Sequence, residues 1–280
     1  MARLLVTGGS GFVLSNVVFE WLTSDDASTA VIFDLHRAWD AAVQAFLAPF
    51  LKSQRLAFCA GSVSDPASWI VLEQEHGMGF THIISGAAIT PTRADEVANA
   101  AAILDVNLFG AVRALEFGRQ LPVGQLKRFI FVSSDAVYEP PGLVRPALEG
   151  EATDDTIGLY CMSKFSGEAA VARWAELYDM DACSVRFADV YGRLDRDTGA
   201  RNRHNAPYWV CTRAAAGLRV GVRGSLDDVG WDYIAAPDVA LAVVAILRCA
   251  SKPKLPVYTI GGGRTVPHEE LLVVAGHPCI

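Results

Sequence analysis

The segment YCMSK places a tyrosine and a lysine, Tyr160 and Lys164, one helical turn apart, so that both would lie on one face of a helix. A free tyrosine has a pKa of about 10, which is too high for an efficient base at neutral pH. A lysine ammonium group held nearby would stabilise the phenolate and lower that pKa. The pair therefore predicts a general base that takes a proton from a hydroxyl group.

A hydroxyl group is predicted to lie beside this pair. The apolar run Phe129–Val132 is typical of a buried strand, and Ser133 and Ser134 follow it directly. A hydroxyl at the carboxyl end of a strand would hydrogen-bond the same substrate oxygen that the tyrosine deprotonates. The three residue types together predict proton removal from an alcohol.

A glycine-rich turn, TGGSGFVLSN, follows the first strand-like run of the chain. Gly8, Gly9 and Gly11 lie between a strand and a helix, where the absent Cβ atoms let the backbone and the helix N-terminus approach a pyrophosphate. Leu14 stands where a third spaced glycine normally allows close packing of helix on strand. We expect Leu14 to push the helix outward by about an ångström and to leave the phosphate contacts in place.

The second strand-like run ends in VIFD and places Asp34 at its carboxyl end. A carboxylate there accepts hydrogen bonds from both hydroxyl groups of an adenosine ribose and repels a 2′-phosphate. Asp34 therefore predicts NAD as the cofactor in preference to NADP. His36 and Arg37 lie close by in the sequence and weaken this preference slightly.

The elements that must position these residues alternate along the chain. The apolar spacing predicts helices over Val13–Leu22 and Phe165–Tyr178. The predicted strands are Arg3–Thr7, Ala30–Asp34, Arg55–Cys59, His82–Ser85, Arg128–Val132, Cys183–Arg186 and Val257–Ile260. The alternation predicts an α/β fold of Rossmann type, a doubly wound parallel sheet with helices on both faces. Residues 1–192 are predicted to form an NAD-binding Rossmann domain that also carries the catalytic residues.

The regular alternation ends after Gly192, and residues 193–280 are predicted to be mainly a small substrate-binding annex, interleaved with returns to the main sheet. Seven arginines lie between 193 and 223 against two acidic residues: Arg193, Arg196, Arg201, Arg203, Arg213, Arg219 and Arg223. Guanidinium groups bind carboxylate or phosphate through paired hydrogen bonds, which favours an anionic substrate. An exposed basic loop with solvated side chains remains the alternative.

The composition restricts the class of protein. The 280 residues are 51% hydrophobic and carry a net charge of −7, which argues against a general nucleic-acid binder. No apolar run reaches the roughly 20 residues that span a bilayer, and no export signal precedes the first strand-like run. The six scattered cysteines include no CxxC pair, so we expect neither disulfides nor a metal site, and a cytoplasmic location.

In the order of its motifs the chain resembles the NAD-dependent epimerase/dehydratase family of extended short-chain dehydrogenases/reductases. The matching segments are TGGSGF, FD, AGSVSD, ISGAA, VNLFGA, VSSDAVY, YCMSK, RFADVYG, DYIAAPDVA and VYTIGGG. The resemblance implies NAD as cofactor and Ser134, Tyr160 and Lys164 as catalytic residues, with Ser134 preferred to Ser133 by its spacing from Val137. The implied cofactor-binding residues are Gly8, Gly11, Phe12, Val13, Asp34, Ser62, Val63, Ala87, Asn107 and Lys164. The implied substrate-binding residues are Thr90, Asp135, Asp189, Arg193 and Arg223.

The chain departs from the family pattern at several of these positions. Ser62 stands where an aspartate usually contacts adenine, so the affinity for the cofactor is expected to be lower. Asp135 matches the acid of the sugar dehydratases, but Ala136 replaces their neighbouring glutamate, which disfavours dehydration. Asp189 replaces an asparagine that contacts substrate, and Arg193 replaces a proline.

The predicted function is an NAD-dependent oxidoreductase that transfers hydride at a secondary alcohol of a sugar acid or another small, anionic polyol. A nucleotide-sugar epimerase with a transient ketone is the alternative, and a non-catalytic NAD-binding protein is a third possibility. The chain ends soon after VYTIGGGRTVPHEELL, whereas family members acting on nucleotide-sugars often continue further, which favours the small substrate. The resemblance also implies a homodimer formed through Val97–Gly118 and Tyr160–Tyr178.

Overall fold

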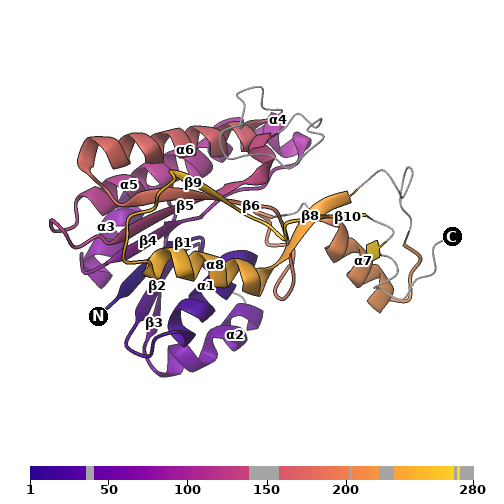
Figure 1. Ribbon diagram of the computed structural model, residues 1–280, viewed down its shortest axis with the longest axis horizontal. Helices are drawn as coiled ribbons and strands as arrows, with labels where there is room; N and C mark the ends of the chain where they lie inside the picture. The colour runs from indigo at the N-terminus through magenta and orange to yellow at the C-terminus, as the bar shows by residue number, and fades with distance from the viewer. Residues whose placement is uncertain (36–40, 139–157, 202–203, 221–229, 268–269, 272–280) are drawn as a thin grey trace.

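The main body of the protein is a parallel sheet of seven strands. The computed structural model describes residues 1–35, 41–138, 158–201, 204–220, 230–267 and 270–271. The strand order is β3-β2-β1-β4-β5-β6-β9, and every pairing is parallel (Figure 1). The strands are β1 (Arg3–Thr7), β2 (Thr29–Asp34), β3 (Leu56–Ala60), β4 (His82–Ser85), β5 (Arg128–Ser134), β6 (Ala182–Phe187) and β9 (Val257–Ile260). The seven predicted strands are thus confirmed, three of them with the predicted bounds.

Helices cover both faces of this sheet (Figure 1). One face carries α1 (Phe12–Thr23), α2 (Ala41–Lys52) and α8 (Ala236–Arg248). The other carries α3 (Pro66–His76), α5 (Gly110–Arg119) and α6 (Leu159–Tyr178), with α4 (Arg93–Leu104) joined to α5 by the π-helical turn η2 (Asp105–Phe109). Each face has its own buried hydrophobic cluster, because a parallel sheet must be covered on both sides. The predicted doubly wound fold is confirmed.

The order of the strands reverses between β1 and β4, which lie side by side at the centre of the sheet. β1 leads to β2 and β3 on one side, whereas β4 leads to β5 and β6 on the other. In doubly wound folds the crevice at the carboxyl ends of two such strands is the usual ligand site. The glycine-rich turn after β1 and the residues after β4 therefore face this crevice.

A smaller sheet lies beyond the carboxyl ends of the main strands (Figure 1). It consists of β7 (Asp189–Tyr191), β8 (Gly230–Ala235) and β10 (Thr265–Pro267), and α7 (Ala206–Ala215) lies beside it. Between β8 and β10 the chain returns to the main body as α8 and β9. The three short strands were not predicted, since runs of three to six residues carry little periodicity.

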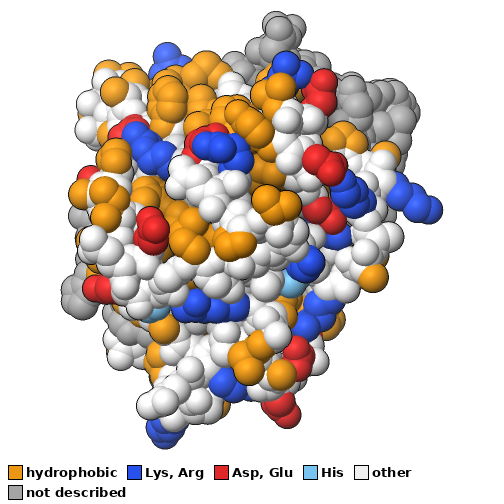
Figure 2. Space-filling model, turned by 90° about the vertical axis from the view of Figure 1, so that its left-hand side faces the viewer, with side chains coloured by type: hydrophobic (Ala, Val, Ile, Leu, Met, Phe, Trp, Pro, Cys, Tyr) orange, Lys and Arg blue, Asp and Glu red, His pale blue; other side chains and the backbone are white. Residues whose placement is uncertain are grey.

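The opposite end of the molecule, where the main strands begin, has a mixed surface. Figure 2 shows hydrophobic side chains there, interspersed with Lys and Arg and with Asp and Glu. Among the described residues, no helix combines the length and the apolar character that crossing a membrane requires.

Candidate active site

The glycine-rich turn is shaped by close approach of two backbone segments. Gly8 has a φ of +73°, and a Cβ on it would come within 2.6 Å of the Cα of Ala87, which follows β4. Gly11 is the N-cap of α1, and no side chain caps this helix. The first-turn N–H groups of α1, which begin at Phe12 and Val13, therefore point into the crevice without a side-chain acceptor. Such an end of a helix fits an anionic pyrophosphate.

Asp34 closes the other side of this turn at the end of β2. Its carboxylate accepts hydrogen bonds from the backbone N–H groups of Ser10 at 3.0 Å and Leu35 at 2.8 Å. Burial raises the pKa of Asp34, while these hydrogen bonds and the charge of Arg196 oppose the rise. The turn, the uncapped helix and the carboxylate together fit NAD, while the contact of Asp34 with the adenosine ribose stays a prediction.

Leu14 is accommodated in a way that the sequence analysis did not anticipate. Its side chain is buried, and a Cβ on Gly86 would collide with its Cδ1. Gly86 directly follows β4, so the missing side chain of Gly86 leaves space for the extra side chain of Leu14. The substitution is thus absorbed by packing, away from the N–H groups of the turn.

The helix that carries Tyr160 and Lys164 packs closely on the strand that carries the serines. A Cβ on Gly167 of α6 would collide with the ring of Phe131 on β5, so this glycine lets the helix approach the strand. Lys164 is 2% exposed, and its Nζ donates a hydrogen bond to the carbonyl oxygen of Val132 at 2.7 Å. The same Nζ lies 5.6 Å from the ring centroid of Tyr160. The predicted helical face is confirmed.

Ser134 and Ser133 have different partners. The hydroxyl of Ser134 is hydrogen-bonded to Tyr160 and donates to Asp135 at 3.2 Å. The hydroxyl of Ser133 donates to the carboxylate of Glu168 at 2.5 Å. The structure therefore brings Ser134, and not Ser133, to the tyrosine.

The pKa of Tyr160 differs from the sequence-based expectation. Burial raises it to about 12, and the hydrogen bond with Ser134 only partly offsets that rise. The charge of Asp135 raises the pKa further, whereas that of Arg201 lowers it. The predicted net lowering of this pKa is not found, because desolvation of the buried hydroxyl is the largest effect on Tyr160, while the Lys164 ammonium group is hydrogen-bonded to the carbonyl oxygen of Val132.

The remaining predicted cofactor residues lie around the crevice. Asn107 is fully buried in η2, and its amide group bonds both backbone groups of Ile89 and the hydroxyl of Ser163. Ser62 shares a hydrogen bond with Ser64 at 2.8 Å between their hydroxyl oxygens. Val63 is buried, and a Cβ on Gly110 would come within 2.7 Å of its side chain. Asn107 thus fastens the segment after β4 to α6, while its direct contact with the cofactor stays a prediction.

The predicted substrate residues are dispersed. Thr90 donates its backbone N–H to the carbonyl of Ala200 at 2.8 Å, which joins the segment after β4 to the annex. Asp189 lies on β7, and burial together with the charge of Asp189 raises the pKa of Tyr233. Arg193 stacks over the ring of Phe46, 4.7 Å from its centroid, and so points towards α2. The fifth predicted residue, Arg223, lies outside the described residues.

Two other arginines of the same segment approach the crevice instead. Arg196 donates a hydrogen bond to the carbonyl oxygen of Ser10 in the glycine-rich turn at 3.2 Å. Arg201 lies over the ring of Phe12, 5.5 Å from its centroid, and its charge acts on Tyr160. Both belong to the arginine-rich stretch between 193 and 223, but spacing in the sequence could not show which arginines lie near the crevice.

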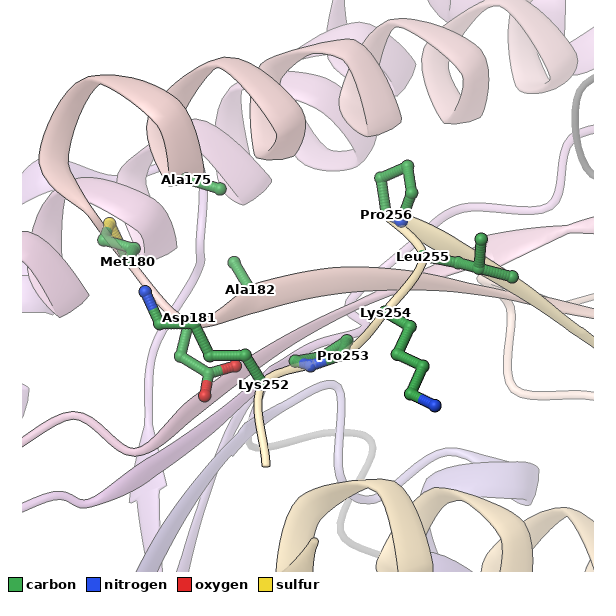
Figure 3. A pocket seen from close by; sticks show the side chains of 9 residues that line it. All are labelled: Ala175, Met180, Asp181, Ala182, Lys252, Pro253, Lys254, Leu255 and Pro256. Carbon is green, nitrogen blue, oxygen red and sulfur yellow. The ribbon is translucent and has the colours of Figure 1, made fainter. Parts of the chain in front are cut away.

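The potential metal ligands and the pocket in Figure 3 lie elsewhere. Cys59, Glu75 and His76 place their donor atoms within 4.8 Å of one another between β3 and α3. Burial and the charge of Arg3 lower the pKa of His76, and we assign no ion to this group. The pocket in Figure 3 is lined by the end of α6, the start of β6 and residues 252–256. It therefore lies at the opposite end of the strands from Ser134, which is paired with the last residue of β6.

Comparison with protein families and curated proteins gives a consistent result. The model of the family described as NAD dependent epimerase/dehydratase matches residues 4–261. UDP-glucuronate 4-epimerase 5 of Arabidopsis thaliana is 25% identical over 285 residues, which are 97% of this chain and 62% of the relative. This chain thus spans about three fifths of the length of the curated relatives that it matches most fully.

Solved structures show the same fold. UDP-glucose 4-epimerase of Thermotoga maritima, solved with UDP-glucose, has a TM-score of 0.81 and 22% identity, with coverage of 99% of this chain and 84% of the other. UDP-glucuronic acid 4-epimerase of Bacillus cereus, solved with UDP-glucuronic acid and NAD, has a TM-score of 0.78 and 18% identity. The match covers 99% of this chain and 84% of the Bacillus cereus chain.

Proposed function

This chain belongs to the NAD-dependent epimerase/dehydratase family, and on that premise we propose that it is a 4-epimerase acting on a nucleotide-linked sugar acid. The observation that carries the proposal is the position of Arg201, which lies over the ring of Phe12 beside the glycine-rich turn, pairs with Asp195 at 3.1 Å and acts through its charge on Tyr160. A guanidinium group at that place suits the carboxylate of a uronic acid. The UDP-glucuronate 4-epimerases among the relatives support the same substrate class.

Each catalytic side chain has a defined task in this proposal. Tyr160 removes the proton of the sugar hydroxyl, and Ser134 holds the same oxygen through its own hydroxyl. Lys164 supplies the positive charge on the helix face of the tyrosine and grips the nicotinamide ribose. NAD, when bound, supplies the hydride acceptor and donor. The proton later returns from Tyr160 to the sugar oxygen, as general acid–base catalysis requires.

Dehydration is not proposed, although dehydratases occur among the relatives. The position that would hold the proton-abstracting glutamate is Ala136, whose backbone N–H donates to the hydroxyl of Ser134 at 3.2 Å. A methyl group cannot exchange a proton. Asp135 alone could protonate a leaving hydroxyl, but it lacks the base that completes the reaction.

The second candidate is a dehydrogenase that oxidises a free sugar acid and releases NADH. The guanidinium group of Arg201 would also bind the carboxylate of a free sugar acid, so the residues alone do not distinguish the epimerase from the dehydrogenase. The difference is in the fate of the hydride, which the epimerase returns to the sugar.

The test is to incubate the protein with NAD and UDP-glucuronate, UDP-glucose or free glucuronate. Absorbance reports NADH, and chromatography reports isomers. We expect UDP-galacturonate to form from UDP-glucuronate without accumulating NADH. Accumulation of NADH with free glucuronate would favour the dehydrogenase, and absence of NAD binding by intrinsic fluorescence would favour a non-catalytic role.

A matched pair of variants tests the carboxylate site. Arg201→Met is expected to lower kcat/KM for UDP-glucuronate by about 10- to 100-fold, which corresponds to the loss of a charge-assisted hydrogen bond. Arg213 belongs to the same arginine-rich region but donates to the carbonyl of Arg219, so Arg213→Met is the control. Equal losses in both variants would remove the assignment of Arg201.

We also propose a homodimer, which the family resemblance implies. The exposed hydrophobic residues Val97 on α4 and Leu177 and Tyr178 on α6 support this arrangement. Light scattering of the protein and of Val97→Glu tests it: the wild type should have twice the mass of the chain, and the variant should shift towards the monomer.

A further inference from the structure

We propose that Glu168 and Arg186 are positioning residues that keep the Lys164 side chain charged and hold the catalytic helix in register with the catalytic strand. Both residues are nearly inaccessible to solvent. The proposal rests on the proposed function for its effect on turnover, but not for its effect on Lys164 itself.

The first step is the environment of Lys164. Its side chain is buried beside the ring of Phe131, and its Nζ donates a hydrogen bond to the carbonyl oxygen of Val132. Burial lowers the pKa of Lys164 to about 8. A neutral lysine could not stabilise a phenolate at Tyr160, so the site needs a negative charge that keeps the ammonium group protonated.

Glu168 supplies that charge. It lies one turn after Lys164 on α6, hence on the same face of the helix as Tyr160. It is 7% exposed, and its carboxylate raises the pKa of Lys164 against the effect of burial. Tyr160, Lys164 and Glu168 thus form one row of titratable groups along the buried face of the helix.

Arg186 holds Glu168 in place from the neighbouring strand. Its Nε donates to Oε1 of Glu168 at 2.8 Å and its terminal nitrogen to Oε2 at 2.6 Å, so the pair is bidentate. Ser133, which is paired with Arg186 in the sheet, donates to the same carboxylate. Three elements, α6, β5 and β6, therefore meet at one carboxylate, immediately behind Ser134.

Arg186 is itself fixed on its other side. The ring of Tyr138 lies 4.7 Å from its guanidinium carbon, and the Tyr138 hydroxyl is hydrogen-bonded to Thr259 on β9 at 2.9 Å. With an ionised Tyr160, charges along the row alternate in sign from the phenolate through Lys164 and Glu168 to Arg186. Such an arrangement holds each charge without leaving a net charge buried.

Other charges also face this row. Asp135 from η3 (Asp135–Tyr138) and Arg201 from the annex act on Tyr160, one raising and the other lowering its pKa. Glu168 is the charged group that acts on Lys164 from the same helix. Changing Glu168 or Arg186 leaves Asp135 and Arg201 in place. A shift in the pKa of Lys164 therefore reports the effect of the Glu168–Arg186 pair.

The experiment measures Lys164 directly. The chain has five lysines, so carbon-13 labelling of the lysine ε-carbon gives a simple NMR spectrum in which Lys164→Met identifies the Lys164 signal. Glu168→Gln removes the negative charge and is expected to lower the pKa of Lys164 by about one pH unit. Arg186→Met exposes the full charge of Glu168 and is expected to raise it, and Arg186→Lys should restore the wild-type value.

The matched control is Glu176→Gln. Glu176 lies near the end of the same helix, is exposed and pairs with Arg173 at 2.8 Å. It should leave the titration of Lys164 unchanged. Shifts of opposite sign in Glu168→Gln and Arg186→Met support the proposal, and an unshifted Lys164 in both overturns it.

A folding defect is addressed by a double variant. Glu168→Gln together with Arg186→Met replaces the buried pair by neutral side chains of similar size, which removes the penalty of one unpaired charge. Glu168 lies closer to Lys164 than Arg186 does, so the double variant should still lower the pKa of Lys164. An unchanged pKa of Lys164 in the double variant would count against the proposal. In active preparations the pH–rate profile should move in the same direction as the NMR titration. If no nucleotide-sugar is converted, the proposed function fails while the NMR result still decides this inference.

Discussion

Arg128 and Arg186 are each 2% exposed, and they lie at opposite ends of the adjacent strands β5 and β6. Arg128 begins β5 and forms an ion pair with Asp181, with 2.6 Å between Nε and Oδ1. It also donates to the carbonyl oxygens of Ile246, Cys249 and Ser251. Its partners are thus one carboxylate and the chain that leaves α8.

Arg186 lies near the end of β6, where its carboxylate partner Glu168 shares a helix face with Lys164 and Tyr160. The burial of the two guanidinium groups is the same, but their neighbours differ. A buried ion pair at the beginning of the strands can only hold elements together. The same kind of pair at the carboxyl ends also raises the pKa of Lys164 through the charge of Glu168. The effect of each buried arginine therefore depends on the residues beside its carboxylate partner, Asp181 for Arg128 and Glu168 for Arg186.

The largest effect is expected at the carboxyl ends of the strands, from Tyr160→Phe. Loss of the acid–base group should lower turnover by at least about 100-fold. Stability and NAD binding should change little, because only one hydroxyl group is removed. Conversion of UDP-glucuronate and quenching of the six tryptophans by NAD measure the two properties. Turnover close to that of the wild type would show that another group is the base.

Arg128→Met tests the other end of the strands. It leaves Asp181 and three carbonyl groups without their partner, so the free energy of unfolding should fall by about 3–5 kcal/mol. The pH–rate profile of the molecules that remain folded should not move. Urea unfolding and the pH profile provide the measurements, and Arg186→Met is the matched variant, with a similar loss of stability and a shifted profile. A shifted profile in Arg128→Met would break the contrast between the two arginines.

Lys164→Met is expected to abolish activity and to stabilise the fold. The pKa of Lys164 is lowered by burial to about 8, so the unfolded chain binds its proton more tightly than the folded protein does. This difference in proton binding destabilises the folded wild type in full below pH 8. The destabilisation disappears as the pH rises towards the pKa of a free lysine. The variant should be more stable by about 2–3 kcal/mol at pH 7 and by much less near pH 10.5. Unfolding at the two pH values measures the difference, and an equal difference at both would contradict it.

The smallest effect concerns the cofactor half of the sheet. Leu14→Gly should change the affinity for NAD by less than about threefold, because the third glycine position serves packing and not phosphate contact. Fluorescence titration measures this affinity. A large loss of affinity would show that Leu14, packed on Gly86, shapes the phosphate-binding turn itself.

Sequence patterns predicted the main sheet well because its strands and helices are local features. The alternation of apolar runs and helical spacing indicated all seven main strands, and the bounds of β1, β4 and β9 were correct. The glycine-rich turn with Asp34, and the row of Tyr160 and Lys164 on one helix face, were likewise predictable. Each follows from spacing within a few residues or from position at the end of a strand.

The sequence by itself thus determined the fold, the family and the identity of the side chains that can move a proton. The tertiary structure alone decided which distant residues meet: Leu14 with Gly86, Arg186 with Glu168, and Arg201 with Phe12. It also decided the direction of the tyrosine pKa, which spacing had predicted incorrectly. The physical reason is that charge and packing depend on burial and on contacts across the chain, and a local pattern contains neither.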